Sequence, residues 1–142
     1  MKLLIGVDDS QESRHAIDVA FEFFGTDADY TVMSIGETRP VFSTGFAGGT
    51  FASAVDLTES FDAAHQAALE LARDAAASLP VDAEVNAHVG HPGVELCEAA
   101  AELEAAAVVI GSHDKNAWER LLHPSIGRYL VDNAPCPVIV VR

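Results

Sequence analysis

The residues best suited to chemistry follow a short apolar run near the end of the chain. Residues 108–110 (Val-Val-Ile) predict a buried strand that continues through Gly111 and Ser112 into a turn. A helix is predicted to begin near Ser125 and Ile126. A helix N-terminus leaves backbone N–H groups unpaired, and these groups can hold an anion, usually a phosphate. The stretch from Gly111 to Ile126 is therefore the candidate binding site.

Catalytic and metal-binding patterns are weak by comparison. The sequence offers no Ser or Cys nucleophile at a recognisable elbow and no P-loop lysine. His88, His91, His113 and His123 fit no zinc template, so we interpret them as solvated or loop histidines. His91 and His113 are nevertheless candidates to line the anion site. No catalytic residue and no metal site are predicted.

The charge balance excludes one large class of partner. The chain has 22 acidic and 8 basic residues, a net charge of −14, and only two lysines, Lys2 and Lys115. Nucleic-acid binding depends on phosphate neutralisation by Lys and Arg, so nucleic acid is not an expected partner. An acidic, lysine-poor surface favours a salt-adapted protein, and an acidic protein from an ordinary cytoplasm is the alternative.

Length and hydrophobicity favour one globular domain over residues 1–142. The chain is 49% hydrophobic and contains no apolar run near the roughly 20 residues of a membrane helix. The apolar stretch at the start of the sequence is too short for a signal peptide and is followed directly by acidic residues. We therefore expect a cytoplasmic protein with no membrane partner. Cys97 and Cys136 adjoin apolar segments, which favours reduced thiols over a disulfide or a metal pair.

Apolar runs and helical spacing alternate along the sequence. They predict strands near residues 3–7, 30–35, 83–89, 108–110 and 137–141, and helices at 11–24, from 61 to just before Pro80, from about Pro92 and from about Pro124. Asp9 with Glu12 suggests a capping box for the first helix. Strands joined by helical crossovers predict an α/β fold, a mostly parallel sheet with helices on both faces.

Such a sheet binds ligands beyond the carboxyl ends of its strands, where the strand order reverses. The first and fourth strands should flank this crevice, which would bring Asp8 close to Gly111. The segment from Gly36 to Thr58 has no periodicity and several glycines and phenylalanines. We predict a loop there, at most with one helical turn, that packs on the domain or on a partner subunit.

Four short motifs, in order, resemble the universal stress protein family over essentially the whole chain. They are Val7–Ser10, Gly90–Pro92, Gly111–His113 and Ala134–Val141. The resemblance implies an open sheet with strand order 3-2-1-4-5, of the Rossmann-like type found in adenine-nucleotide alpha hydrolases.

The resemblance also implies a homodimer that pairs the last strand with its two-fold mate, through Val138, Ile139, Val140 and Val141. An apolar edge strand needs cover, which a second copy would provide. The alternative is a monomer in which a loop or Arg142 shields this edge.

Relatives that hold ATP resemble the pattern Gly, two residues, Gly, nine residues, Gly, then Ser or Thr. Here Gly111 and Ser125 fit, whereas Asp114 and Pro124 stand in place of glycines. The Asp114 carboxylate would repel phosphate and Pro124 removes a backbone donor, so the site is expected to be weakened. Three alternatives stay open: the site binds ATP with Mg²⁺, it binds AMP or another anion, or it binds no nucleotide.

The family assigns a role to each matching position. Asp8 and the backbone around Ile35 would hold the base and sugar, while Gly111, Ser112, Ser125 and Ile126 would hold the phosphates. Asp8 could instead cap the first helix. The resemblance implies a stress-response binding or regulatory module, with a nucleotide-independent interaction dimer as the alternative. It does not imply an enzyme, although slow ATP hydrolysis is left open by fold analogy.

Overall fold

The computed structural model describes residues 1–38, 54–112 and 126–142. The predicted glycine-rich loop, apart from its ends, and the turn from His113 to Ser125 lie outside the described residues. The predictions for Asp114, Pro124 and Ser125 therefore rest on the sequence alone.

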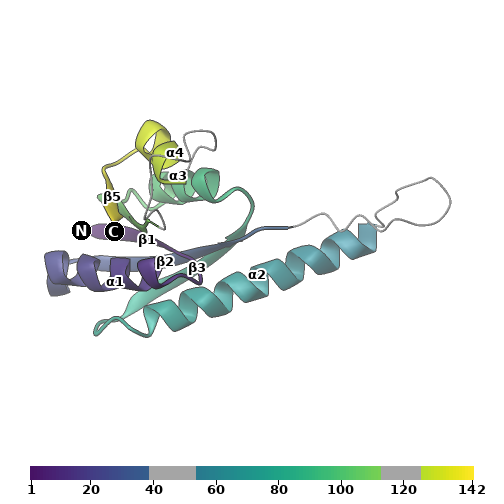
Figure 1. Cartoon of the computed structure of the whole chain (residues 1–142), viewed down its shortest axis with the longest axis horizontal. Helices are drawn as coiled ribbons and strands as arrows, with labels where there is room; N and C mark the ends of the chain where they lie inside the picture. The colour runs from purple at the N-terminus through teal and green to yellow at the C-terminus, as the bar shows by residue number, and fades with distance from the viewer. Residues whose placement is uncertain (39–53, 113–125) are drawn as a thin grey trace.

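Strands and helices alternate as the sequence predicts. The elements are β1 (Lys2–Val7), α1 (Gln11–Phe24), a short 3-10 helix η1 (Gly25–Asp27), β2 (Asp29–Gly36), α2 (Ala54–Ala76), β3 (Ala83–Val89), α3 (Pro92–Glu102), β4 (Ala107–Gly111), α4 (Ile126–Asn133) and β5 (Val138–Val141). All strand pairs are parallel, and the order across the sheet is β3-β2-β1-β4-β5. This order confirms the predicted fold class (Figure 1).

The sheet is covered on both faces. Figure 1 shows α1 and α2 on one side of the strands and α3 and α4 on the other. Because side chains alternate along a strand, Leu3 and Ile5 of β1 join the core under α1 and α2, whereas Leu4 joins the core under α3. All three side chains are almost completely buried. The continuous apolar run of β1 therefore reflects a strand with two covered faces.

Helix α2 begins earlier than the sequence predicted. We placed residues 54–58 in a loop, but they form the start of a helix that runs to Ala76. Leu57, Phe61, Ala64 and Ala68 share one face of this helix at spacings of three and four residues. Ala68 is buried, whereas Leu57 and Phe61 are about half exposed because this end of α2 projects past the sheet (Figure 1). Over the described ranges, no helix is long and apolar enough to cross a membrane.

The start of α1 corrects a second prediction. The N-cap is Ser10, not Asp9: the Ser10 hydroxyl accepts a hydrogen bond from the Ser13 backbone N–H at 3.1 Å. Ser10 is extended and Ser13 is buried under the helix, so the cap faces the protein interior. Asp9 is exposed. The spacing of Asp9 and Glu12 fits a capping box, but the cap was misplaced by one residue.

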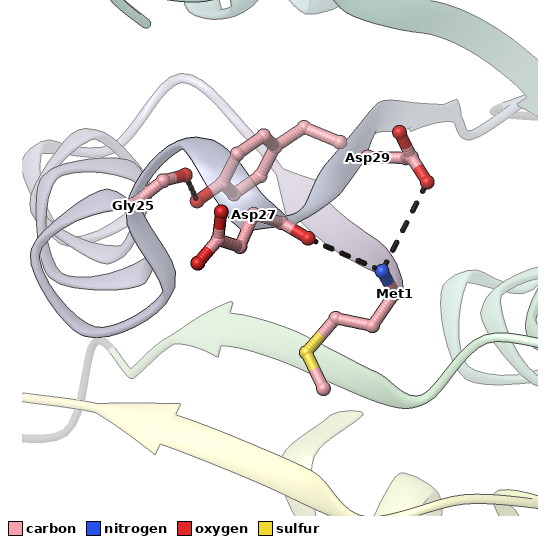
Figure 2. A network of polar contacts seen from close by, with 5 residues as sticks. Met1, Gly25, Asp27 and Asp29 are labelled. Atoms are coloured by element: carbon pink, nitrogen blue, oxygen red, sulfur yellow. Dashed lines mark hydrogen bonds and ion pairs between the residues drawn. The ribbon is translucent and has the colours of Figure 1, made fainter.

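The chain start is fixed at the opposite edge of the sheet from the carboxyl ends of the strands. The Met1 ammonium donates to the Asp27 carbonyl oxygen at 3.3 Å and lies 4.0 Å from the Asp29 carboxylate. Tyr30 donates its hydroxyl hydrogen to the Gly25 carbonyl oxygen at 2.7 Å. Figure 2 shows these contacts joining η1 to the residue before β1 and to the start of β2. These contacts lie at the amino ends of β1 and β2, at the opposite end of the strands from the candidate site.

Candidate functional site

The strand order reverses between β1 and β4, which are neighbours in the sheet. Gly6 of β1 pairs with Ile110 of β4, so Asp8 and Ser112 follow at the same edge of the sheet. Helix α1 leaves this edge on one face, and α3 packs on the other. This is the position at which open parallel sheets bind ligands. The predicted proximity of Asp8 and the Gly111 turn is confirmed.

Gly111 allows α1 to approach β4. A methyl group added at Gly111 would overlap the Glu12 carbonyl group and lie 2.6 Å from the Ser13 backbone nitrogen. Such distances are far inside van der Waals contact, so only glycine fits here without a shift of the backbone. The glycine that the sequence assigned to phosphate binding therefore has a packing role in the described structure.

Asp8 is the centre of a small polar network at the start of α1. One of its carboxylate oxygens, Oδ1, accepts hydrogen bonds from the Ser10 backbone N–H at 3.0 Å, from the Ser10 hydroxyl, and from the Ser13 hydroxyl at 2.5 Å. The Asp8 backbone N–H donates to the Ser13 hydroxyl oxygen at 3.0 Å. These bonds fix the carboxylate just beyond β1. Asp8 as a residue is exposed, so it remains accessible to a ligand at the carboxyl end of β1.

Ile35 lies at the same edge. Val7 of β1 pairs with Ser34 of β2, which places Ile35 beside Asp8 where the two chains leave the sheet. Ile35 is half-buried and packs on the core under α3. At the next residue, Gly36, a methyl group would lie 2.5 Å from the Ala64 carbonyl oxygen. Helix α2 thus closes over the end of β2 and limits how far the site extends in that direction.

The backbone amide of Ser112 is already used. Its N–H donates to the Val141 carbonyl oxygen at 2.7 Å, which extends the ladder between β4 and β5 by one residue. This amide cannot also bind a phosphate without breaking the sheet bond. Among the positions predicted to hold phosphate, Ser112 therefore cannot contribute its main-chain donor in this conformation.

Ile126 is the first residue of α4 and is exposed. The helix is anchored to α3 by a contact that the sequence analysis missed. A methyl group at Gly93 would lie 2.6 Å from Cδ1 of Tyr129, and the ring centroids of Tyr129 and His91 are 5.5 Å apart. His91, a predicted lining residue, is the exposed N-cap of α3. The only sequence signal for this contact was a glycine directly after the first residue of a helix.

The two thiols lie away from the carboxyl ends of the strands and pack against the core under α3. Burial raises the pKa of Cys97, and the nearby Cys136 and Glu98 raise it further. Burial also raises the pKa of Cys136, although a hydrogen bond from the Val108 backbone lowers it in part. Both cysteines are free and border the same apolar cluster. In the described part of the chain, no three His, Cys, Asp or Glu side chains are placed to hold a metal ion.

Comparisons with known proteins agree with this architecture. Residues 1–142 match the model of the Universal stress protein family. A universal stress protein of Methanocaldococcus jannaschii is 30% identical over 146 aligned residues, which cover 99% of this chain and 81% of the relative.

Three solved structures share the fold. The universal stress protein UspA of Lactobacillus plantarum superposes with a TM-score of 0.72 at 24% identity, with 100% of this chain and 97% of that one covered. A universal stress protein in complex with cAMP gives 0.70 at 23% identity, with coverage of 100% and 97%. An Arabidopsis thaliana family protein with AMP bound gives 0.63 at 15% identity, with coverage of 99% and 90%. The chain described here belongs to the universal stress protein family.

Proposed function

We propose that this chain is a regulatory module that binds an adenine nucleotide in the crevice between β1 and β4. The observation that carries the proposal is the convergence of Asp8, Ile35 and Gly111 at one edge of the sheet. The structures of family members with cAMP and with AMP support an adenine nucleotide as the ligand class. A stress-response role follows from the family alone.

The proposed base and sugar end of the site lies at Asp8 and Ile35. The Asp8 carboxylate is oriented by Ser10 and Ser13, so it would accept hydrogen bonds from a ribose with little loss of side-chain freedom. The peptide groups beside Ile35 lie at the end of β2, where no further strand residue pairs with β1. Ile35 also pairs with His88 of β3, so only the peptide groups on the β1 side are proposed to bind the edge of a purine.

The phosphate end is proposed to lie between Gly111 and the first turn of α4. Backbone N–H groups at the start of a helix favour an anion, and Ile126 occupies that position. Ser125, just before it in the sequence, would add a hydroxyl donor. Because the Ser112 amide is used by β5, we assign Ser112 to the wall of the site and not to phosphate binding through its main chain.

The net charge of −14 opposes a polyphosphate ligand. Bound Mg²⁺ would supply positive charge to offset part of this repulsion, and concentrated salt would screen the remainder. AMP carries fewer negative charges than ATP, so the same electrostatic field penalises it less. We therefore expect ATP binding to depend on Mg²⁺ more strongly than AMP binding.

We further propose a homodimer that pairs β5 with its two-fold mate. β5 is an edge strand of four apolar residues, Val138–Val141, and only Val141 is buried. Val140 is 40% exposed. A uniformly apolar edge strand with open backbone groups favours pairing with a second copy.

Isothermal titration with Mg-ATP and with AMP, at low and at molar salt, tests the nucleotide proposal. A dissociation constant below about 100 µM for either nucleotide supports it. The second candidate is a dimer that binds partner proteins without nucleotide, which the prior use of the Ser112 amide favours. If neither nucleotide produces a heat of binding at low or at molar salt, the nucleotide proposal is rejected and the nucleotide-independent dimer becomes the proposed function.

A further inference from the structure

A pocket lies between α2, the carboxyl end of β3 and α3. It has a volume of about 440 Å³ and is lined by Phe61, Asp62 and His65 from α2, residues 87–89 of β3, and Glu95 from α3. β3 is an edge strand, separated from β4 by both β2 and β1. Its residue His88 pairs with Ile35 of β2, so the pocket adjoins the proposed base end of the nucleotide site.

Glu95 is held in a fixed orientation in this pocket. One carboxylate oxygen, Oε2, lies 2.9 Å from Nδ1 of His88, and the side chains of Glu95 and His88 are 21% and 34% exposed. The other oxygen, Oε1, occupies the space where a side chain at Gly90 would lie. A partly buried carboxylate with one oxygen held by an imidazole is an oriented hydrogen-bond acceptor.

The opposite wall adds a second carboxylate and an aromatic ring. Asp62 and His65 make no hydrogen bond or ion pair within the part of the chain that the structure describes. Phe61 is 47% exposed, so its ring is accessible at the rim. Carboxylates next to an accessible ring suit a cation that also has an apolar part, because the ring face attracts positive charge.

Two other ligand classes fit less well. The carboxylates of Asp62 and Glu95 would repel an anion, and the net charge of −14 on the chain would add to this repulsion. A metal ion would need a group of three or more ligating side chains, which the described residues do not form. An organic ammonium ion needs only one oriented carboxylate and an apolar surface.

We propose that the pocket between α2, β3 and α3 binds a protonated amine that carries an aromatic or aliphatic group. Its ammonium would donate to Glu95, with Asp62 nearby, and its apolar part would lie against Phe61. No residue that lines this pocket is assigned to the nucleotide site, although His88 pairs with Ile35 at the proposed base end of that site.

Titration of the full-length protein with phenethylamine, followed by backbone amide NMR, tests the proposal. The matched control ligand is 2-phenylethanol, which has the same ring but no charge. We expect the amine to bind at least about fivefold more tightly than the alcohol and to shift the amide signals of His88 and Glu95. Glu95→Gln should remove this preference, whereas Asp74→Asn, an exposed carboxylate further along α2, should leave it intact.

Equal affinities for the amine and the alcohol would overturn the proposal. Equal losses in Glu95→Gln and Asp74→Asn would also overturn it, because they would show general attraction to an acidic surface. Should Glu95→Gln fail to fold, Phe61→Ala provides the test at a half-exposed position. An unchanged amine affinity in Phe61→Ala would contradict the proposed aromatic wall.

Discussion

Gly111, the last residue of β4, lies so close to Ser13 in the first turn of α1 that an added methyl group would be 2.6 Å from the Ser13 backbone nitrogen. The side chain of the same Ser13 donates to Asp8 at 2.5 Å. The end of β1, the start of α1 and the end of β4 therefore form one packed unit. The shape of the candidate site depends on this unit as well as on the residues that would touch a ligand.

Gly111→Ala tests this packing. The new methyl group must push α1 away from β4, and we expect the free energy of unfolding to fall by about 1–3 kcal/mol. Denaturant unfolding measures the loss. Ala101→Ser is the control, because it adds one atom at an exposed position of α3 and should change stability by less than about 0.5 kcal/mol. Similar losses in the two variants would contradict close contact at Gly111.

Ser10→Ala tests the cap that replaces the predicted one. Loss of the hydroxyl leaves the Ser13 N–H without its acceptor and removes a partner of Asp8, so we expect a loss of about 1–2 kcal/mol. Asp9→Ala should have a much smaller effect, because Asp9 is exposed and is not the N-cap. Thermal or denaturant unfolding of both variants measures the difference. A larger loss in Asp9→Ala would reinstate the capping box.

Asp114→Gly tests the electrostatic part of the nucleotide proposal. Two like unit charges about 4 Å apart repel by about 4 kcal/mol at an effective dielectric constant of 20, an upper limit of about three powers of ten in affinity. We therefore expect the variant to bind Mg-ATP more tightly, and more so at low salt than at molar salt. Isothermal titration at both salt concentrations measures the change. Unchanged affinity would remove charge repulsion from the account.

Val140→Lys tests the proposed dimer. A charge on the exposed face of β5 should prevent strand pairing between copies and halve the mass measured by light scattering, with the fold retained. Leu57→Lys is the control, since Leu57 is similarly exposed but lies on the projecting end of α2. A wild-type protein that is already monomeric, or a Val140→Lys variant that stays dimeric, would rule out pairing through β5.

Stability at alkaline pH should depend on the two cysteines. Burial raises the pKa of both thiols above the ordinary value of 9.0, so the folded state favours the neutral form. The resulting stabilisation is present below about pH 9 and is lost as the pH rises through the folded-state pKa values. We expect the free energy of unfolding to decline as the pH rises above about 9, and to decline less in Cys97→Ala/Cys136→Ala. The same decline in both proteins would assign the effect to other groups, such as the buried Tyr30.

The sequence predicted the parts of the fold that local periodicity determines. The bounds of α1 were predicted correctly because Ala16, Ile17 and Ala20 recur on one helical face and are buried. The buried run of β4 was similarly clear. The start of α2 was missed because Leu57 and Phe61, although on the core-facing stripe, adjoin a segment without any period.

Features that depend on contacts between distant segments could not be predicted. The use of the Ser112 amide by Val141 requires knowledge of the register between β4 and β5. The contact of Tyr129 with Gly93 requires the packing of α4 on α3. Proximity of Asp8 to the end of β4 was predictable, since strand order alone determines it. The sequence could not predict which backbone N–H groups stay available to a ligand.

Mapping the nucleotide contact tests the central claim most directly. Backbone amide NMR of the whole chain during titration with AMP should show saturable shifts at Asp8, Ile35, Gly111 and Ile126, with little change at Asp29 and Tyr30, which lie at the opposite end of β2. Saturable shifts confined to β3 and α2, or no shifts at AMP concentrations up to about 10 mM, would contradict a nucleotide site between β1 and β4.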